Sequence, residues 1–207
     1  MVITEHEHTA KREVCTSCEK PLALCYCSLI KSWPNHWPVH LIQHYKEKSH
    51  PYGTAKIAQL SLNSISTIEL QDQANFMPTS SEADRWQNAI LIYPADAIDK
   101  ETLDIQSLKG KTPRPLVFID GTWRKSKAIV LGSPFLQKLP RYSFTSSEMP
   151  RYRIRKAKRL DFYSTLEAIV TVLNTVENTE HYSQLLEVMD WMVDQQAAFI
   201  NKQRDAY

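Results

Sequence analysis

Short apolar runs alternate with amphipathic stretches along most of this chain, which is the pattern of an α/β protein. Apolar runs of strand length occur at 39–44, 64–70, 89–93 and 116–119, and another short strand is expected within 136–144. Apolar residues recur at helical spacing in the stretches 55–60, 124–131, 164–176 and 182–203. The alternation predicts a mostly parallel sheet with helices on both faces.

The run Leu116–Ile119 suits the centre of that sheet. It is apolar and rich in β-branched and aromatic residues, and prolines stand before it. Asp120 follows at its carboxyl end, the edge where open α/β sheets bind ligands. Gly121 permits a tight turn there, and Thr122 and Trp123 add a hydroxyl and a flat ring. The run therefore marks a candidate site, although Asp120 would also suit the N-cap of the next helix.

Local signals place the ends of several helices. Ser164 and Glu167 have the spacing of a capping box, which predicts a helix beginning at that point. Gly132 and Pro134 are expected to end the helix at 124–131. Thr54 precedes the stretch 55–60 and could cap it. The stretch 71–88 is expected to be a loop or an exposed helix.

Composition limits the classes of function. The 207 residues are 43% hydrophobic, enough for one α/β domain with a small appendage, and the net charge is only +2. The 4 glycines form neither a dinucleotide-binding nor a Walker-type loop. No apolar run reaches the ~18 residues that span a bilayer, and the first residues carry no signal-peptide core. We expect a cytoplasmic protein without membrane contact. The sequence leaves the oligomeric state open, with a monomer as the simpler expectation.

All 4 cysteines lie in one short segment. Cys15 and Cys18 form a C-x-x-C pair, and Cys25 and Cys27 form a tighter C-x-C pair. Four thiolates at such spacing can hold one tetrahedral Zn²⁺, and free thiols or a redox pair are the alternatives. We expect residues 1–34 to form an N-terminal tail and a zinc-binding segment, and residues 35–207 to form the main domain.

The strongest charge signal is a basic run at 151–159. Its cations include Arg151, Arg153, Arg155, Lys156 and Lys158, with aromatic residues among them. Cations neutralise phosphates and aromatic rings stack on unpaired bases, so the run could bind RNA. A solvated face is the alternative.

The motif Asp120-Gly121-Thr122-Trp123 resembles the signature of the DTW-domain family. Further matches in the same order are Leu91-Ile92-Tyr93-Pro94, Leu139-Pro140, Tyr152-Arg153-Ile154-Arg155-Lys156 and Ser164-Thr165-Leu166-Glu167-Ala168. The chain departs from the family pattern at Tyr45, where proline is usual, and at Gly53, where asparagine is usual. Members are tRNA-uridine aminocarboxypropyltransferases, similar to the knotted SPOUT enzymes that use S-adenosylmethionine, and many carry a similar cysteine cluster.

The resemblance implies a reaction and a site. The 3-amino-3-carboxypropyl group of S-adenosylmethionine would move to N3 of a uridine in tRNA, with Asp120 as the base or as an orienting group. Thr122, Trp123 and Arg124 would bind the RNA together with the basic run. By the SPOUT analogy, the co-substrate would lie in loops that follow three strands, against Thr54, Tyr93, Pro94, Asp120, Leu139, Pro140, Ser164 and Thr165. The alternatives are a SPOUT-type RNA methyltransferase and a non-catalytic zinc-containing RNA-binding protein.

Overall fold

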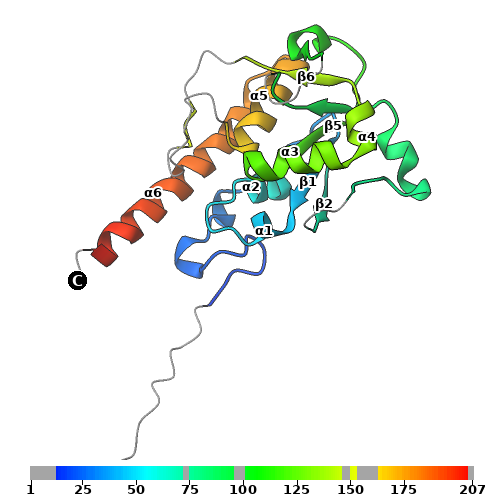
Figure 1. Cartoon of the computed structure of the whole chain (residues 1–207). Coiled ribbons are helices and arrows are strands. Elements are labelled where there is room, and N and C mark those ends of the chain that lie inside the picture. The colour runs from blue at the N-terminus through cyan, green and yellow to red at the C-terminus, as the bar shows by residue number, and fades with distance from the viewer. Residues whose placement is uncertain (1–12, 72–74, 96–100, 146–149, 153–162, 205–207) are drawn as a thin grey trace, which may run out of the picture.

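One all-parallel sheet forms the centre of the molecule. The computed structural model describes residues 13–71, 75–95, 101–145, 150–152 and 163–204 (Figure 1). The six strands in these ranges are ordered β2-β1-β5-β3-β6-β4, and every pairing between them is parallel. Their bounds are β1 Val39–His44, β2 Ile65–Leu70, β3 Ile90–Ile92, β4 Leu103–Asp104, β5 Leu116–Asp120 and β6 Arg141–Ser143. The predicted α/β class is confirmed.

Helices cover both faces of the sheet, as the sequence pattern indicated (Figure 1). The α-helices are α1 Tyr45–Lys48, α2 Ala55–Ser61, α3 Trp123–Gly132, α4 Pro134–Lys138, α5 Thr165–Glu177 and α6 Gln184–Arg204. Short 3-10 helices are η1 Leu22–Leu24, η2 Cys27–Leu29, η3 Ser80–Trp86, η4 Ile105–Leu108 and η5 His181–Ser183. The helix α4 was not predicted, because Pro134 was read only as an end signal, whereas it occupies the first turn of a new helix capped by Ser133.

The core has one layer on each side of the sheet. On one side, α2, α5, α6 and η4 pack on inward-facing strand residues such as Leu41 and Phe118. On the other side, α3, α4 and η3 pack on residues such as Ile42 and Val117. Successive residues of a central strand thus face opposite layers, so β1 is buried along its whole length and β5 along almost its whole length, although β1 also contains His40, Gln43 and His44.

The parallel arrangement brings the carboxyl ends of the strands to one edge. β1 ends at His44, β3 at Ile92 and β5 at Asp120, and the chain leaves each of them on this edge. α1 follows β1 directly, and α3 follows β5 after a two-residue turn. The polar residues that end these strands are therefore neighbours although they are far apart in the sequence.

The N-terminal segment packs onto the main core. Cys18 and Tyr26 are buried in the layer that contains α2 and α6. Trp33 forms a parallel bridge with Leu62, and the Lys20 ammonium donates to the carbonyl oxygens of His50 and Pro51. The domain boundary at residue 34 and the knot stay predictions, and the expected tail at 1–12 lies outside the described residues. No helix among the described residues is long and apolar enough to cross a membrane.

Candidate functional site

Asp120 is a buried carboxylate held from two sides. It is the last residue of β5, in register with Gln43 of β1, and only 8% of it is exposed. Gln43 Nε2 donates to Asp120 Oδ2 at 2.7 Å, and Thr165 Oγ1 donates to Oδ1 at 2.5 Å. Because each carboxylate oxygen accepts from a different element, the plane of the group is fixed. Asp120 does not cap α3, since the N-cap residue is Thr122.

The first turn of α5 is tied to several elements around Asp120. Ser164 and Glu167 form the predicted capping box, while Thr165 binds the carboxylate of β5. The Leu166 backbone N–H donates to Thr54 Oγ1 at 3.4 Å. Thr54 therefore supports the start of α5. The side-chain cap on α2 that the sequence suggested for Thr54 is not formed. Two of the first amides of α5 are thus already occupied, at Leu166 and Glu167.

Glu167 also anchors the start of the basic run. Its side chain is 3% exposed. Oε1 accepts from the backbone N–H groups of Arg151 at 2.6 Å and Tyr152 at 3.2 Å, and Oε2 accepts from Ser164 N at 2.7 Å. The Tyr152 hydroxyl donates to the carbonyl of Tyr52 at 2.6 Å. Arg151 and Tyr152 are therefore fixed against the helix that holds Asp120.

The turn after Asp120 presents its motif residues to solvent. Thr122 Oγ1 accepts from Lys125 N, and Trp123 begins α3 with 39% of its surface exposed. The ring of Trp123 meets the edge of the Tyr93 ring with centroids 6.4 Å apart. Lys125 pairs at 2.9 Å with Glu47, whose side chain is 5% exposed, which joins α3 to α1. Arg124 is exposed on the first turn of α3.

Tyr93 and Pro94 follow β3 at the same edge as Asp120. Tyr93 is buried on the α3 side, where its hydroxyl lies 3.3 Å from Ser126 Oγ and the Arg141 guanidinium lies 5.8 Å from its ring centre. Burial raises the pKa of Tyr93 and lowers that of Arg141. The Tyr93 phenol is therefore a neutral group at physiological pH.

The prediction that Leu139 and Pro140 lie in a loop following a strand is wrong. They precede β6, and Pro140 O accepts from Leu91 N at the amino end of β3. Register places Arg141 beside Leu91 and Leu91 beside Val117. Leu139 is thus about five strand residues, or roughly 16 Å, from the level of Asp120. Leu139 instead packs in the apolar layer under α3 and α4.

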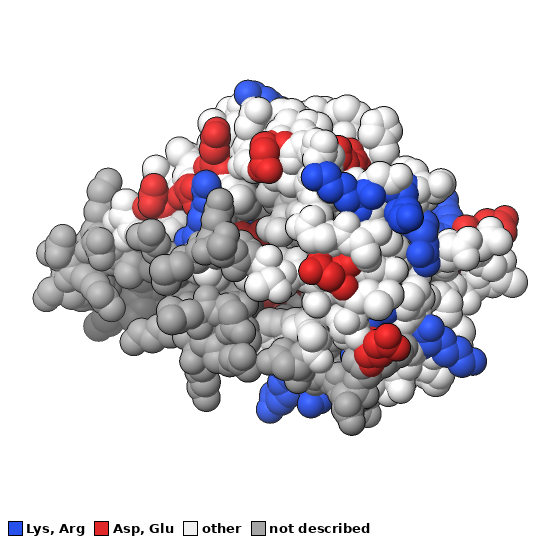
Figure 2. Space-filling view, turned by 90° about the horizontal axis from the view of Figure 1, so that it is seen from above, with Lys and Arg blue, Asp and Glu red and all other residues white. Residues whose placement is uncertain are grey.

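The basic run is described only at its start. Arg151 is exposed and pairs with Asp190 of α6 at 3.4 Å, while Arg153, Arg155, Lys156 and Lys158 lie outside the described residues. The face of the molecule in Figure 2 carries Lys and Arg side chains next to Asp and Glu. The prediction that the run binds RNA therefore stays a prediction.

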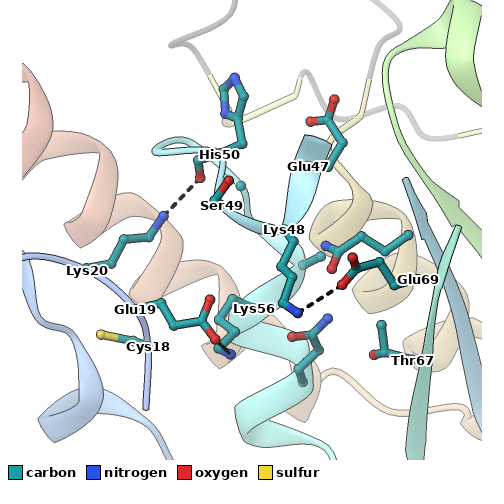
Figure 3. A pocket seen from close by; sticks show the side chains of 14 residues that line it. Cys18, Glu19, Lys20, Glu47, Lys48, Ser49, His50, Lys56, Thr67 and Glu69 are labelled. Atoms are coloured by element: carbon teal, nitrogen blue, oxygen red, sulfur yellow. Dashed lines mark hydrogen bonds and ion pairs between the residues drawn. The ribbon is translucent and has the colours of Figure 1, made fainter. Parts of the chain in front are cut away.

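A cavity of about 310 Å³ lies beside Gln43 (Figure 3). It is bounded by the ends of β1 and β2, by α1 and α2, and by the cysteine segment, through the lining residues Cys18, Glu19, Lys20, Gln43, Glu47, Lys48, Ser49, His50, Gly53, Ala55, Lys56, Gln59, Thr67 and Glu69. Register sets Glu69, Gln43 and Asp120 side by side on one face of the sheet. The cavity is thus the neighbour of the Asp120 carboxylate on the β1–β2 side.

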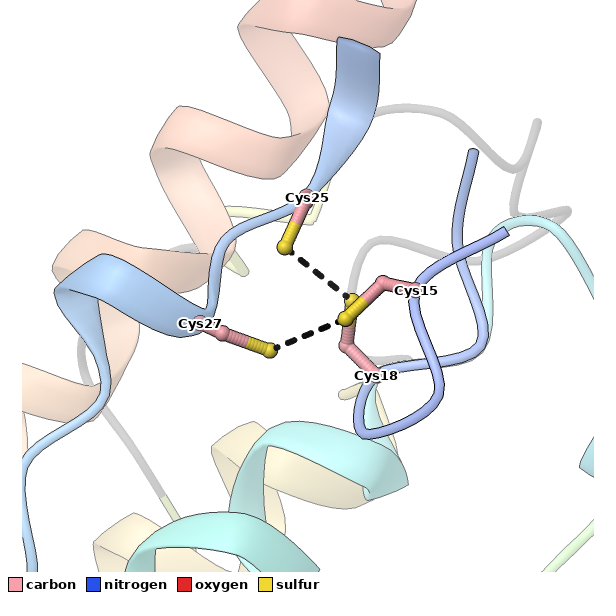
Figure 4. A group of neighbouring side chains, drawn as sticks. All are labelled: Cys15, Cys18, Cys25 and Cys27. Carbon is pink, nitrogen blue, oxygen red and sulfur yellow. Dashed lines mark hydrogen bonds between the residues drawn. The ribbon is translucent and has the colours of Figure 1, made fainter. Parts of the chain in front are cut away.

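The four cysteines converge on one point (Figure 4). All four sulfurs lie within 4.8 Å of one another, with Cys15 and Cys27 at 3.6 Å and Cys18 and Cys25 at 3.8 Å. A tetrahedral Zn²⁺ with Zn–S bonds of about 2.3 Å places its sulfurs about 3.8 Å apart. The cluster therefore fits one such ion, and no pair is joined as a disulfide.

The thiols differ in how readily they ionise. Backbone N–H groups of Cys18 and Ser17 lower the pKa of Cys15 to about 6. Burial raises the pKa of Cys18, and burial with the nearby sulfurs raises that of Cys27 to about 12. Four thiolates this close require a cation between them, which is the chemistry of a metal centre.

Three residues of the site were not predicted from the sequence. Gln43 was read only as part of a strand, Glu167 only as a capping residue, and Glu47 was given no role. The available signal was a polar residue where a buried one was expected. Gln43 follows Leu41 and Ile42 in a buried strand, and Glu167 stands in an apolar helix.

The comparisons with known proteins agree with the motif. The DTW domain matches residues 12–197. The chain is 27% identical over 184 residues to a protein of Drosophila melanogaster called tRNA-uridine aminocarboxypropyltransferase 2. The aligned region covers 85% of this chain and 71% of that protein. No solved structure matches the chain.

Proposed function

The chain belongs to the DTW domain family, and on that premise we propose that it transfers the 3-amino-3-carboxypropyl group of S-adenosylmethionine to N3 of a uridine in tRNA. The name of the Drosophila relative supports the reaction class. The observation in the structure that carries the proposal is Asp120, a buried carboxylate oriented by Gln43 and Thr165 at the edge of the sheet where ligands bind.

The chemistry explains why one oriented carboxylate suffices. N3 of the uracil attacks the carbon that joins the aminocarboxypropyl chain to sulfur. The bond between this carbon and sulfur breaks, and methylthioadenosine leaves with the bonding electrons. The N3 proton passes to Asp120 or to water. Since the sulfonium is already a good leaving group, the protein mainly has to hold N3 in line with that carbon and away from the methyl group.

Asp120 has two possible roles in this step. As the base it accepts the N3 proton, and as an orienting group it holds the uracil or the sulfonium by charge. Its contacts with Gln43 and Thr165 orient both oxygens of the carboxylate. Both roles require the fixed orientation that these two donors give.

We assign the co-substrate to the β3 side of Asp120. Tyr93 and Pro94 follow β3 at this edge, and Ser164 and Thr165 open α5 next to it. Trp123, exposed at the start of α3, supplies a ring for stacking, and Thr122 and Arg124 flank it. The basic run, with Arg151 fixed by Glu167, would neutralise phosphates of the tRNA.

The cysteine cluster has a structural role in this proposal. Cys15, Cys18, Cys25 and Cys27 would hold one Zn²⁺ with no open position for substrate, because four thiolates complete its coordination. The segment also bears Lys20, which binds the carbonyls of His50 and Pro51. A metal here would therefore stabilise one wall of the cavity.

Incubation with S-adenosylmethionine and unmodified tRNA tests the proposal. One sample of co-substrate carries the label in the aminocarboxypropyl group and the other in the methyl group, and nucleosides are analysed by mass. The first label in a uridine, with release of methylthioadenosine, is the expected result. Transfer of the methyl label with S-adenosylhomocysteine would instead show a methyltransferase, and tRNA binding with no co-substrate binding would show an RNA-binding protein.

A further inference from the structure

The cavity beside Gln43 is distinct from the side of Asp120 that we assign to S-adenosylmethionine. Gln43 stands between Glu69 and Asp120 in register, lines the cavity (Figure 3), and donates to the same carboxylate that Thr165 holds from α5. A ligand in the cavity would approach Asp120 from one side while a ligand near Tyr93 approached from the other. Such an arrangement suits a reaction between two substrates.

The charged groups of the cavity are already paired with one another. Lys48 pairs with Glu69 at 2.9 Å, and Lys56 pairs with Glu19 at 2.8 Å. The carboxylate of Glu47 pairs with Lys125, and the Lys20 ammonium donates to two carbonyl oxygens. A zwitterionic ligand such as the amino-acid end of S-adenosylmethionine would have to break these pairs, which disfavours it.

Three uncharged side chains also line the cavity. The Gln43 side chain uses its N–H₂ on Asp120, and no hydrogen bond occupies its carbonyl oxygen among the described residues. The side chains of Gln59 and Thr67 line the cavity and make no hydrogen bond among the described residues. The amide N–H₂ of Gln59 and the hydroxyl of Thr67 can donate to the two carbonyl groups of a uracil ring, which leaves N3 for the reaction.

Size points to the same ligand. A cavity of about 310 Å³ is at the lower end of small-molecule sites, which span roughly 300–1,000 Å³. It suits one nucleotide better than the whole of S-adenosylmethionine.

We propose that this cavity receives the target nucleotide of the RNA, with the uracil turned out of its stack, its carbonyl groups bound by Gln59 and Thr67, and N3 directed toward the Gln43–Asp120 pair. Enzymes that react at a base atom extrude that base into a pocket. In this position the ring would lie next to Gln43, the residue that orients Asp120, and N3 would face this pair as the proposed function requires. The inference rests on the proposed function, because it identifies the subsite for the RNA substrate of that reaction.

The variant Gln59→Leu tests the assignment, because it keeps the size of the side chain and removes its hydrogen bonds. Gln87→Leu is the matched control, since Gln87 is exposed near the amino end of β3. We expect Gln59→Leu to raise the KM for unmodified tRNA about tenfold, the effect of one lost hydrogen bond. The Kd for S-adenosylmethionine, measured calorimetrically, should stay unchanged, as should both constants in Gln87→Leu.

A second measurement does not depend on transfer. Unmodified tRNA that contains 4-thiouridine is bound to the wild-type protein and irradiated, and the cross-linked peptides are identified by mass. Cross-links to the stretch 49–70 are expected, and Gln59→Leu should reduce them. If Gln59→Leu leaves the KM for tRNA unchanged and no cross-link falls in this stretch, the inference is overturned. It is also overturned if Gln59→Leu weakens the binding of S-adenosylmethionine and leaves the KM for tRNA normal, because the cavity would then hold the co-substrate. If the wild type binds tRNA but transfers nothing, the proposed function fails independently of where the cross-links lie.

Discussion

Replacement of Asp120 by Asn separates the charge of this group from its shape. The Asn Oδ1 can still accept from Thr165, but its Nδ2 would meet the N–H₂ of Gln43. Rotation of the Gln43 amide by a half turn brings its oxygen toward Nδ2, because that oxygen has no other hydrogen bond among the described residues. The network therefore survives in neutral form.

The expected loss of stability follows from this exchange. Hydrogen bonds to a charged group contribute about 1.5–3 kcal/mol and those between neutral groups about 0.5–1.5 kcal/mol, so two exchanges cost about 2–3 kcal/mol. The relief of a buried charge reduces that cost. Activity should fall by at least ~10²-fold, the lower end for an acid–base group. The free energy of unfolding in urea and the transfer rate measure the two effects separately.

The control is Asp104→Asn, which makes the same chemical change at an exposed residue that accepts from Gln106 N at the start of η4. A pH series then distinguishes the roles of Asp120. If Asp120 is the base, the activity of Asp120→Asn should recover partly as the pH approaches the pKa of uracil N3. If Asp120 only orients substrate, the defect should be constant. Activity close to wild type at neutral pH would refute both roles.

Three further outcomes are expected. Protein purified without chelator should contain one zinc per chain, and strong chelation should lower its melting temperature; four freely titrating thiols with no metal would contradict the site. Glu167→Ala should weaken tRNA binding more than Ser164→Ala, since both lose part of the capping box but only the first removes the acceptor that holds the backbone at Arg151. Equal affinities would show that this contact has no role in binding. Alanine at Arg153, Arg155 and Lys156 together should flatten the salt dependence of tRNA binding, and an unchanged slope would mark the run as a solvated face.

Much of the fold follows from local signals. The predicted strand 39–44 matches β1, and the strand at 116–119 and the helix at 124–131 are each within about one residue of β5 and α3. Burial explains this accuracy, since both strands are central and their apolar residues face a core layer on each side of the sheet. The capping box at Ser164 was equally readable because its two partners are three residues apart.

The site was less predictable because its contacts are long-range. Gln43 and Asp120 are 77 residues apart in sequence, and no local pattern marks an amide that will face a carboxylate. The misplacement of Leu139 and Pro140 had a local cause. Pro134, which was expected only to end the preceding helix, begins the helix α4, so β6 begins only at Arg141. Leu139 and Pro140 therefore lie at the amino ends of the strands and not at the carboxyl ends, where they were expected.

The first turn of α5 gives a physical reason for the position of the site. Thr165 holds the carboxylate at the end of β5, the Leu166 amide binds Thr54 before α2, and Glu167 holds the backbone at Arg151. Each contact is made by a different residue of one rigid turn, and three segments separated in the chain are thereby fixed relative to one another. Because apolar residues of α5 pack along the sheet, the turn cannot move without disturbing the core. The core packing of α5 therefore fixes the direction of the Asp120 carboxylate, so stability and reactivity depend on the same helix.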